Sequence, residues 1–291
     1  MKYFLYQGCS LEASGIHYMI SLEAVAEVLG VHFKEIEDWN CCGASISYVG
    51  GNELSVEVLA ARNLALAEAQ GGMDIVAPCS SCYIVLNKVN HKLQESPVLL
   101  AKVNEVLAED NLKYSGKLKA RHLLDVLYND VGLAKIKGAV KKPLKGVKVA
   151  GYVGCQTVRP YGEYDSVEKP VIQDKILEVL GATVVPFPKK MRCCGSGLFL
   201  TELEACYELA RDILEDAQSN GGEIISTACP MCQMNLEAYQ KRMNKALGTN
   251  FNIPVVFVTQ LMALAFGLDA KKAGAMDRLL ISANPYLKAV A

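Results

Sequence analysis

Short β-prone runs alternate with longer stretches of helical periodicity along the chain. The first half contains three such runs, each followed by a loop and a helical stretch, and the second half repeats this order. The alternation predicts an α/β fold in which a mainly parallel sheet is covered by helices. The β-prone runs are 2–6, 31–36 and 74–77 in the first half and 148–152, 182–185 and 223–227 in the second. The main helical stretches are 21–29, 53–70, 171–180 and 202–218.

A lysine-rich segment, 134–146, separates the two halves. It carries five lysines and Pro143, a composition typical of a solvated linker. The sequence therefore predicts two domains, 1–143 and 144–291. Residues 271–291 have no counterpart in the first half, and we expect this C-terminal tail to pack on a neighbouring subunit.

The composition describes a globular chain and excludes several function classes. The 291 residues are 51% hydrophobic and carry a net charge of −1, so nucleic acid is not an expected partner. The longest apolar stretch, 255–268, contains Thr259, Gln260 and Gly267 and is too short to span a membrane, so no transmembrane segment is expected. The N-terminal apolar run is too short for a signal peptide, and a cytoplasmic location is expected.

Cysteine is the unusual residue in this composition. Eleven cysteines, an odd number in a chain without an export signal, are poorly explained by structural disulfides. Ten of them form two sets with the same order: one cysteine, then Cys-Cys-Gly, then Cys-x-x-Cys. The first set is Cys9, Cys41, Cys42, Cys79 and Cys82, and the second set is Cys155, Cys193, Cys194, Cys229 and Cys232. Cys206 is left over, and we expect it to be a buried structural thiol.

The residues between the cysteines also match, which indicates an internal repeat. Within the sets, the gaps are 31 and 35 residues in the first half and 37 and 33 in the second. Ala61-Arg62-Asn63-Leu64 corresponds to Ala210-Arg211-Asp212-Ile213, and both precede a Gly-Gly pair and the Cys-x-x-Cys. The halves are therefore predicted to be duplicates related by a pseudo-twofold axis.

The cysteines of each half follow the β-prone runs. Because the carboxyl ends of parallel strands meet at one edge of a sheet, we expect each set of five thiols to converge there. A Cys-x-x-Cys alone fits a zinc site, a redox-active dithiol or an iron–sulfur cluster. A structural zinc site closes with four ligands, whereas each half offers five thiols and no histidine at ligand spacing. The pattern favours iron–sulfur ligation, with zinc and a dithiol as alternatives.

These motifs resemble those of the B-type subunit of heterodisulfide reductase, a family built from CCG (cysteine-rich) domains. The resemblance extends from Tyr3 to about Gly267. The residues that carry it are Tyr6-Gln7-Gly8-Cys9, Asp38-Trp39-Asn40-Cys41-Cys42-Gly43-Ala44, Pro78-Cys79-Ser80-Ser81-Cys82, Gly154-Cys155 with Arg159-Pro160, Arg192-Cys193-Cys194-Gly195 and Cys229-Pro230-Met231-Cys232.

The resemblance implies two tandem, Rossmann-like CCG domains with clusters at the carboxyl ends of their strands. Each five-cysteine set would bind one noncubane [4Fe-4S] cluster, and a disulfide substrate would be cleaved, or formed, between the two clusters. The heterodisulfide of coenzyme M and coenzyme B is one candidate substrate. Cys9, Cys41, Cys42, Cys193 and Cys194 are the ligands that we expect to take part in catalysis.

The resemblance also implies partners. Such subunits work with an iron–sulfur subunit of the C type and a flavin subunit of the A type, which deliver electrons. This chain has neither a Cys-x-x-Cys-x-x-Cys run nor a Gly-x-Gly-x-x-Gly loop, so we expect it to depend on such partners. One position departs from the methanogen enzymes, which typically have His where this chain has Gln156. Gln is not an acid near neutral pH, so proton delivery would differ here, or the substrate would.

Three other features are candidates for a role at the site. His17 could donate a hydrogen bond or proton, and Arg159 could bind an anionic group of the substrate. Acidic residues precede Cys41, whereas Lys189, Lys190 and Arg192 precede Cys193. Because positive charge favours the reduced form of a cluster, we expect the second set to have the higher potential, with solvated surface turns as the alternative.

Two further function classes compete with disulfide catalysis. An electron-transfer CCG subunit of a succinate, lactate, glycolate or sulfur-oxidising complex would have no disulfide substrate of its own. A zinc-bound scaffold protein is the other alternative. Both sets are complete, which favours catalysis, because a simple electron relay would tolerate the loss of one set.

Overall fold

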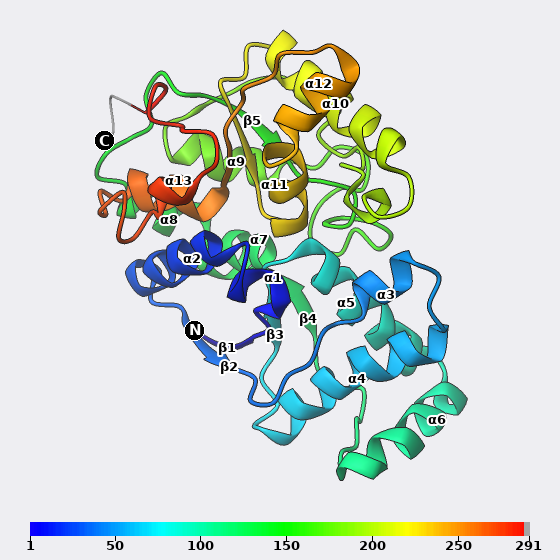
Figure 1. The fold of residues 1–291 in the computed structure, drawn as a ribbon. Coiled ribbons are helices and arrows are strands. Elements are labelled where there is room, and N and C mark those ends of the chain that lie inside the picture. The colour runs from blue at the N-terminus through cyan, green and yellow to red at the C-terminus, as the bar shows by residue number, and fades with distance from the viewer. Residues whose placement is uncertain (288–291) are drawn as a thin grey trace.

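The computed structural model describes residues 1–287 and shows two α/β halves that lie against each other (Figure 1). Each half contains a four-stranded sheet whose paired strands are all parallel. The strand orders are β2-β1-β3-β4 and β6-β5-β7-β8, so the topology repeats. The strands are β1 (Lys2–Leu5), β2 (His32–Glu35), β3 (Ile75–Ala77), β4 (Ala120–His122), β5 (Lys148–Tyr152), β6 (Thr183–Val184), β7 (Ile224–Thr227) and β8 (Val255–Phe257). The predicted fold class is confirmed.

The fourth strand of each sheet was not predicted. Both β4 and β8 are three residues long, and each pairs only with the Cys-x-x-Cys strand, β3 or β7. In the sequence, Val255–Phe257 runs directly into an apolar helix, so periodicity alone cannot separate the strand from the helix.

Helices cover both sheets. In the first half they are α1 (Gly8–Glu12), α2 (Ile16–Leu29), α3 (Ala44–Tyr48), α4 (Glu53–Ala69), α5 (Ser80–Glu95), α6 (Pro97–Leu107), the short α7 (Leu123–Asp125) and α8 (Leu133–Ala139), with the 3-10 turn η1 (Ala108–Asp110) and the π-helical η2 (Val126–Val131). In the second half they are α9 (Ile172–Val179), α10 (Leu203–Ser219), α11 (Pro230–Glu237), α12 (Gln240–Leu247) and α13 (Val258–Ala265), with the 3-10 turns η3 (Ser196–Leu198) and η4 (Met276–Arg278).

Local sequence explains where several helices begin and end. The side chain of Asn52 accepts a hydrogen bond from the Ser55 N–H and caps α4, and Ser96 caps α6 immediately before Pro97. Helix α2 ends at Gly30, which adopts the left-handed conformation with φ 62°. These signals fix the helices that lead into and out of the cysteine loops.

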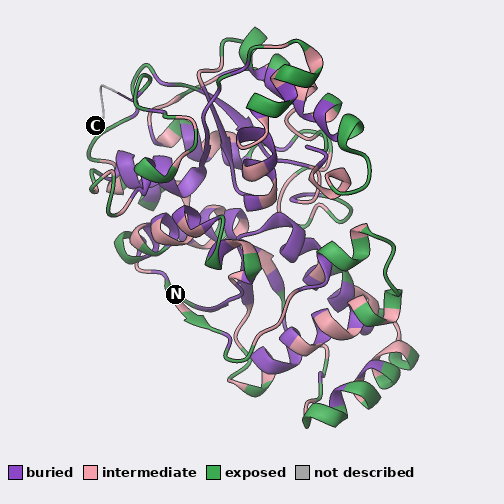
Figure 2. Cartoon of the chain, viewed as in Figure 1, coloured by how far each residue is buried: buried purple, intermediate pink, exposed green. Residues whose placement is uncertain are grey.

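The core extends through the junction between the halves. Strands β3 and β7 are entirely buried, and α2 of the first half packs against α13 of the second (Figure 2). The buried hydroxyls of Ser21 and Thr259 lie 2.7 Å apart across this contact. The buried side chains form two hydrophobic clusters, and each cluster contains residues of both halves.

The segment predicted as a linker is partly helical. Helix α8 lies within it, and the side chain of Ile136 is fully buried in the core that both halves share. The segment expected to be a tail also packs on its own chain, because Met276, Ala283 and Leu287 are buried there. Residues 288–291 of that segment lie outside the described residues.

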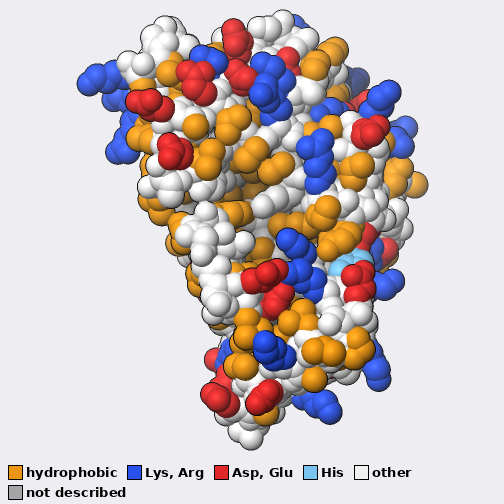
Figure 3. Space-filling view, turned by 90° about the vertical axis from the view of Figure 1, so that its right-hand side faces the viewer, with side chains coloured by type: hydrophobic (Ala, Val, Ile, Leu, Met, Phe, Trp, Pro, Cys, Tyr) orange, Lys and Arg blue, Asp and Glu red, His pale blue; other side chains and the backbone are white. Residues whose placement is uncertain are grey.

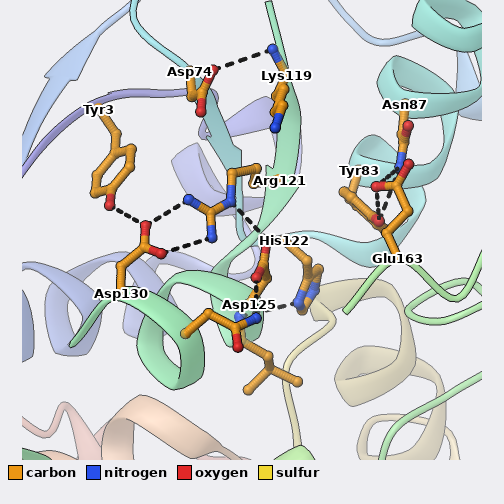
Figure 4. A network of polar contacts seen from close by, with 12 residues as sticks. Tyr3, Asp74, Tyr83, Asn87, Lys119, Arg121, His122, Asp125, Asp130 and Glu163 are labelled. Carbon is orange, nitrogen blue, oxygen red and sulfur yellow. Dashed lines mark hydrogen bonds and ion pairs between the residues drawn. The ribbon is translucent and has the colours of Figure 1, made fainter. Parts of the chain in front are cut away.

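Polar networks accompany these contacts. On β4, Arg121 forms ion pairs with Asp125 (2.7 Å) and Asp130 (2.5 Å), and the hydroxyl of Tyr3 donates a hydrogen bond to Asp130 (Figure 4). Glu163 of the second half accepts a 2.8 Å hydrogen bond from Asn87 of α5. On the face shown in Figure 3, Lys and Arg side chains are interspersed with Asp and Glu.

Candidate functional site

Each five-cysteine set gathers at the carboxyl ends of the strands, as the topology requires. In the first half, Cys9 follows β1, Cys79 directly precedes α5 and Cys82 lies in the first turn of that helix. The Sγ atoms of Cys42 and Cys82 are 3.4 Å apart. The corresponding Sγ atoms of Cys194 and Cys232 are 3.5 Å apart. Loops distant in the sequence thus bring their thiols together in both halves.

The thiols differ in exposure. Cys9 and Cys193 are exposed, whereas Cys41 and Cys155 are partly exposed. The buried members of the sets are Cys42, Cys79, Cys82, Cys194, Cys229 and Cys232. Each set therefore has an inner group of thiols and an edge that reaches solvent. Cys206 is buried, as expected, and its Sγ lies 3.4 Å from Oδ1 of Asn235.

Neighbouring thiols favour an anionic sulfur in each set. Hydrogen bonds from Cys41 and then Cys82 lower the pKa of Cys42 to about 4. Hydrogen bonds from Cys155 and Cys194 lower the pKa of Cys193 to about 2. Thiolates are the form in which cysteine binds metals, so these contacts favour Cys42 and Cys193 as ligands. The same contacts raise the pKa of their neighbours Cys41 and Cys155.

Glycine makes room for the sulfur atoms. Gly8 and Gly154 precede the first cysteine of their sets and have φ values of +67° and +78°. A Cβ atom at Gly8 would lie 3.0 Å from the Sγ of Cys82. At Gly154, a Cβ would lie 3.6 Å from the Sγ of Cys232. The positive φ would strain a larger residue at either position, and at Gly8 the added Cβ would also crowd the thiol of Cys82.

Two tyrosines that the sequence patterns did not single out support the cysteine loops. The hydroxyl of Tyr6 donates a 2.7 Å hydrogen bond to the carbonyl oxygen of Asn40, the residue before Cys41. In the second half, Tyr152 donates a 2.5 Å hydrogen bond to the carbonyl oxygen of Arg192, the residue before Cys193. The signal for them is the repeated Tyr-x-Gly-Cys, present once in each half.

A cavity of about 350 Å³ lies at the second set and reaches the first half. Its wall joins Tyr48, Ser80 and Ser81 of the first half with Gln156 of the second. Oε1 of Gln156 lies 2.9 Å from the hydroxyl of Tyr48 and 2.8 Å from that of Ser81. The other lining residues are Gly154, Cys155, Cys193, Cys194, Ser196, Gly197, Leu198, Leu209, Cys229 and Cys232. All five thiols of the second set therefore face one cavity.

Two candidates from the sequence lie away from this cavity wall. His17 is buried against Phe257, with ring centroids 4.9 Å apart, and burial lowers its pKa to about 4. Arg159 is exposed, and its Nε lies 3.4 Å from the carbonyl oxygen of Val167. Neither residue is among those that line the cavity.

Each of the basic residues before Cys193 forms an ion pair with a carboxylate. Arg192 and Lys189 pair with Asp212 at 2.8 Å and 3.7 Å, and Lys190 pairs with Asp174. In the first half, the acidic Asp38 pairs with Arg62 at 2.6 Å. The charge difference between the two loops is therefore reduced but not removed, because Asp212 is shared by Lys189, Arg192 and Arg211.

The donor set fits a group that contains several metal atoms. Within residues 1–287, no group of three or more His, Cys, Asp or Glu side chains is arranged to hold a metal ion. Five thiols around a cavity, with glycines that clear the space beside them, suit the larger core of an iron–sulfur cluster.

No helix among the described residues combines the length and the apolar character that crossing a membrane requires. The longest described helices, α4 and α10, have 17 residues each. Both belong to the covering layers of their sheets.

Curated proteins similar to this chain belong to reductases. A membrane anchor subunit of the 8-methylmenaquinol:fumarate reductase of Wolinella succinogenes is 35% identical over 94% of this chain and 95% of its own. A protein of Archaeoglobus profundus, named as similar to the B-type subunit of heterodisulfide reductase, is also 35% identical, over 94% and 93%. The B-type subunit of a ferredoxin/F420H2-dependent CoB-CoM heterodisulfide reductase of Methanosarcina acetivorans is 30% identical, over 94% and 92%.

A solved structure and a family model agree with the duplicated architecture. The crystal structure of a hypothetical protein from Helicobacter pylori matches 97% of this chain and 52% of its own, with a TM-score of 0.77 and 15% identity, which supports the fold alone. The model of the cysteine-rich domain, CCG, matches residues 3–87 and again residues 149–237. The chain therefore belongs to the CCG cysteine-rich domain family, in which it resembles the B-type subunits of heterodisulfide reductases.

Proposed function

We propose that this chain is the catalytic iron–sulfur subunit of a heterodisulfide reductase-type complex and breaks, or forms, a disulfide. The observation that carries the proposal is the cavity in which the second set faces Tyr48, Ser80 and Ser81 of the first half. The first and second sets would each hold one noncubane [4Fe-4S] cluster. Two relatives that carry heterodisulfide reductase names over most of the chain support it.

Cleavage of a disulfide consumes two electrons and two protons and yields two thiols. A pair of bound clusters would supply one electron each and iron atoms that bind the separated sulfurs. The chain contributes the wall of the cavity, where Leu198 and Leu209 limit water and Tyr48 and Gln156 offer hydrogen bonds. Electrons would arrive through an iron–sulfur partner and a flavin-binding partner.

The test is turnover of a panel of disulfides, including the coenzyme M–coenzyme B heterodisulfide, by the purified complex with a reduced electron donor. The wild-type complex is expected to reduce at least one disulfide, and Cys193→Ala is expected to abolish this activity. Cys206→Ala is the matched control, because Cys206 is buried outside the sets. Unchanged turnover in Cys193→Ala would overturn the proposal.

A second function is favoured by two observations. The relative from Wolinella succinogenes, which is 35% identical to this chain as the Archaeoglobus profundus protein is, is named as a subunit of a fumarate reductase. The residues that line the cavity include no Asp, Glu, His, Lys or Arg, and burial raises the pKa of Tyr48, so apart from the cysteines the described wall offers only a weak acid to protonate a leaving thiolate. On this alternative, the chain relays electrons within a dehydrogenase or reductase complex. The complex would then exchange electrons rapidly with its partner subunits and reduce no disulfide in the panel.

A further inference from the structure

A single tyrosine contacts both Cys-x-x-Cys turns at the centre of the molecule. Tyr18 of α2 is fully buried, and its hydroxyl lies 3.4 Å from the carbonyl oxygen of Pro78 and 3.3 Å from that of Ala228. These carbonyls belong to the residues immediately before Cys79 and Cys229.

Stacking across the junction holds the ring of Tyr18 in place. Its ring lies against that of Phe257, at the end of β8, with centroids 4.1 Å apart and planes 9° from parallel. The ring is therefore fixed by the second half while its helix belongs to the first. An aromatic residue clamped in this way places its hydroxyl with little freedom.

The duplication supplies an internal comparison. Tyr164 follows Cys155 by nine residues, as Tyr18 follows Cys9. It stacks on His122, which ends β4, with centroids 6.0 Å apart and planes 3° from parallel. Its hydroxyl, however, is buried without a hydrogen-bond partner among the described residues. The two tyrosines occupy equivalent places, and only Tyr18 joins the two turns.

The hydroxyl proton of Tyr18 is what allows two carbonyl oxygens to approach the same point. Each oxygen carries a partial negative charge, and the surrounding side chains are buried. Without the donor, the two oxygens would lose one of their partners in a dry environment. The ring of His122, which also interacts with the backbone of Pro78 and Ala228, would remain. The hydroxyl therefore acts as a brace between the two turns.

We propose that Tyr18 is a positioning residue that sets the separation of the two cysteine sets by holding their Cys-x-x-Cys turns together. The inference rests on the proposed function to the extent that each set holds a cluster. It adds that the hydroxyl of Tyr18 contributes to the distance between the two clusters, beside the 2.7 Å contact between the hydroxyls of Ser80, in the first Cys-x-x-Cys turn, and Thr157 of the second half. Because electron exchange falls steeply with distance, this brace governs how readily the clusters share electrons.

The test compares Tyr18→Phe with Tyr164→Phe in the whole complex purified without oxygen. Iron content reports whether both sets are loaded, and the dipolar splitting in the electron paramagnetic resonance spectrum of the fully reduced protein reports the separation of the clusters. In Tyr18→Phe we expect unchanged iron and a loss of part of the splitting. In Tyr164→Phe we expect both quantities to equal those of the wild type.

The other outcomes would contradict either the role of Tyr18 or the proposed function. Wild-type splitting in Tyr18→Phe, or an equal loss in Tyr164→Phe, would overturn the role of Tyr18. Wild-type protein with fewer than about eight irons per chain would instead contradict the proposed function. If Tyr18→Phe does not fold, 4-aminophenylalanine at position 18, which offers an N–H to each carbonyl, is expected to keep the full splitting. A reduced splitting there would refute the brace.

Discussion

The sulfur atoms of Cys42 and Cys82 lie 3.4 Å apart, although they come from a loop after β2 and from the first turn of α5. Strand β1 lies between β2 and β3 in the sheet, so this contact joins loops from non-adjacent strands. Each set is therefore assembled only when the whole sheet has formed. Loss of one thiol should disturb its own set and spare the other.

Replacing Cys42 by Ala is expected to remove about four of about eight irons, because the first set alone loses a ligand. Iron and sulfide analysis of the anaerobically purified protein measures this loss. Cys206→Ala serves as the control and should retain all of the iron, since Cys206 is buried outside both sets. Complete loss of iron in Cys42→Ala would show that the two sets do not load independently.

Removing the hydroxyl of Tyr6 should loosen the loop that carries Cys41, because its hydrogen bond to the carbonyl of Asn40 is lost. A hydrogen bond of this kind contributes about 1 kcal/mol, so Tyr6→Phe is expected to release iron to a chelator about fivefold faster. Tyr152→Phe should have the same effect on the second set. Equal release rates in wild type and variants would contradict the supporting role of the tyrosines.

Asp212 balances Arg192 and Lys189 in front of the second set. Asp212→Asn leaves these cations unopposed and should raise the midpoint potential of that cluster, by at most about 40 mV because exposed ion pairs contribute no more than about 1 kcal/mol. Redox titration followed by electron paramagnetic resonance measures the shift. The companion variant Asp38→Asn, which leaves Arg62 paired with Asp110 alone, should affect only the first set.

Glu237 should make the stability of the protein depend on pH. Burial raises the pKa of this carboxyl from 4.5 to about 7 in the folded chain, so the folded state binds more protons than the unfolded state between these values. The stabilisation is complete below about pH 4.5 and is lost as the pH rises to about 7, by at most about 3 kcal/mol.

Urea unfolding at about pH 5 and about pH 8 measures this dependence. In Glu237→Gln the change in the free energy of unfolding should shrink, because the side chain no longer titrates. The buried His17, whose pKa falls to about 4, works in the opposite direction and lowers stability in acid. A pH dependence identical in wild type and variant would rule out Glu237 as its source.

The repeated cysteine pattern predicted most of the architecture. The strand expected at 148–152 is β5 without a change of boundary, and the helix expected at 53–70 differs from α4 by one residue. Such elements are defined by local periodicity and by residues that stop helices, which are readable from sequence alone. The parallel sheets then followed from the alternation of strands and helices.

The details that depend on tertiary packing could not be predicted. The charge contrast near Cys193 was visible, but its compensation by Asp212 requires a contact across 20 residues of chain. Tyr18 of the first half stacks on Phe257 of the second, and Tyr164 of the second half stacks on His122 of the first. These contacts were also invisible, because the sequence does not show which half each ring contacts. Contacts of this kind depend on how two folded units meet.

Tyr18 stacks on Phe257 and Tyr164 stacks on His122, so each half places an aromatic ring against the other. This reciprocal stacking bears on how the protein unfolds as well as on how it folds. Neither half completes its own interior, so neither can melt while the other stays intact. The duplicated chain is therefore expected to unfold as a single cooperative unit, so unfolding would dismantle both sets at once.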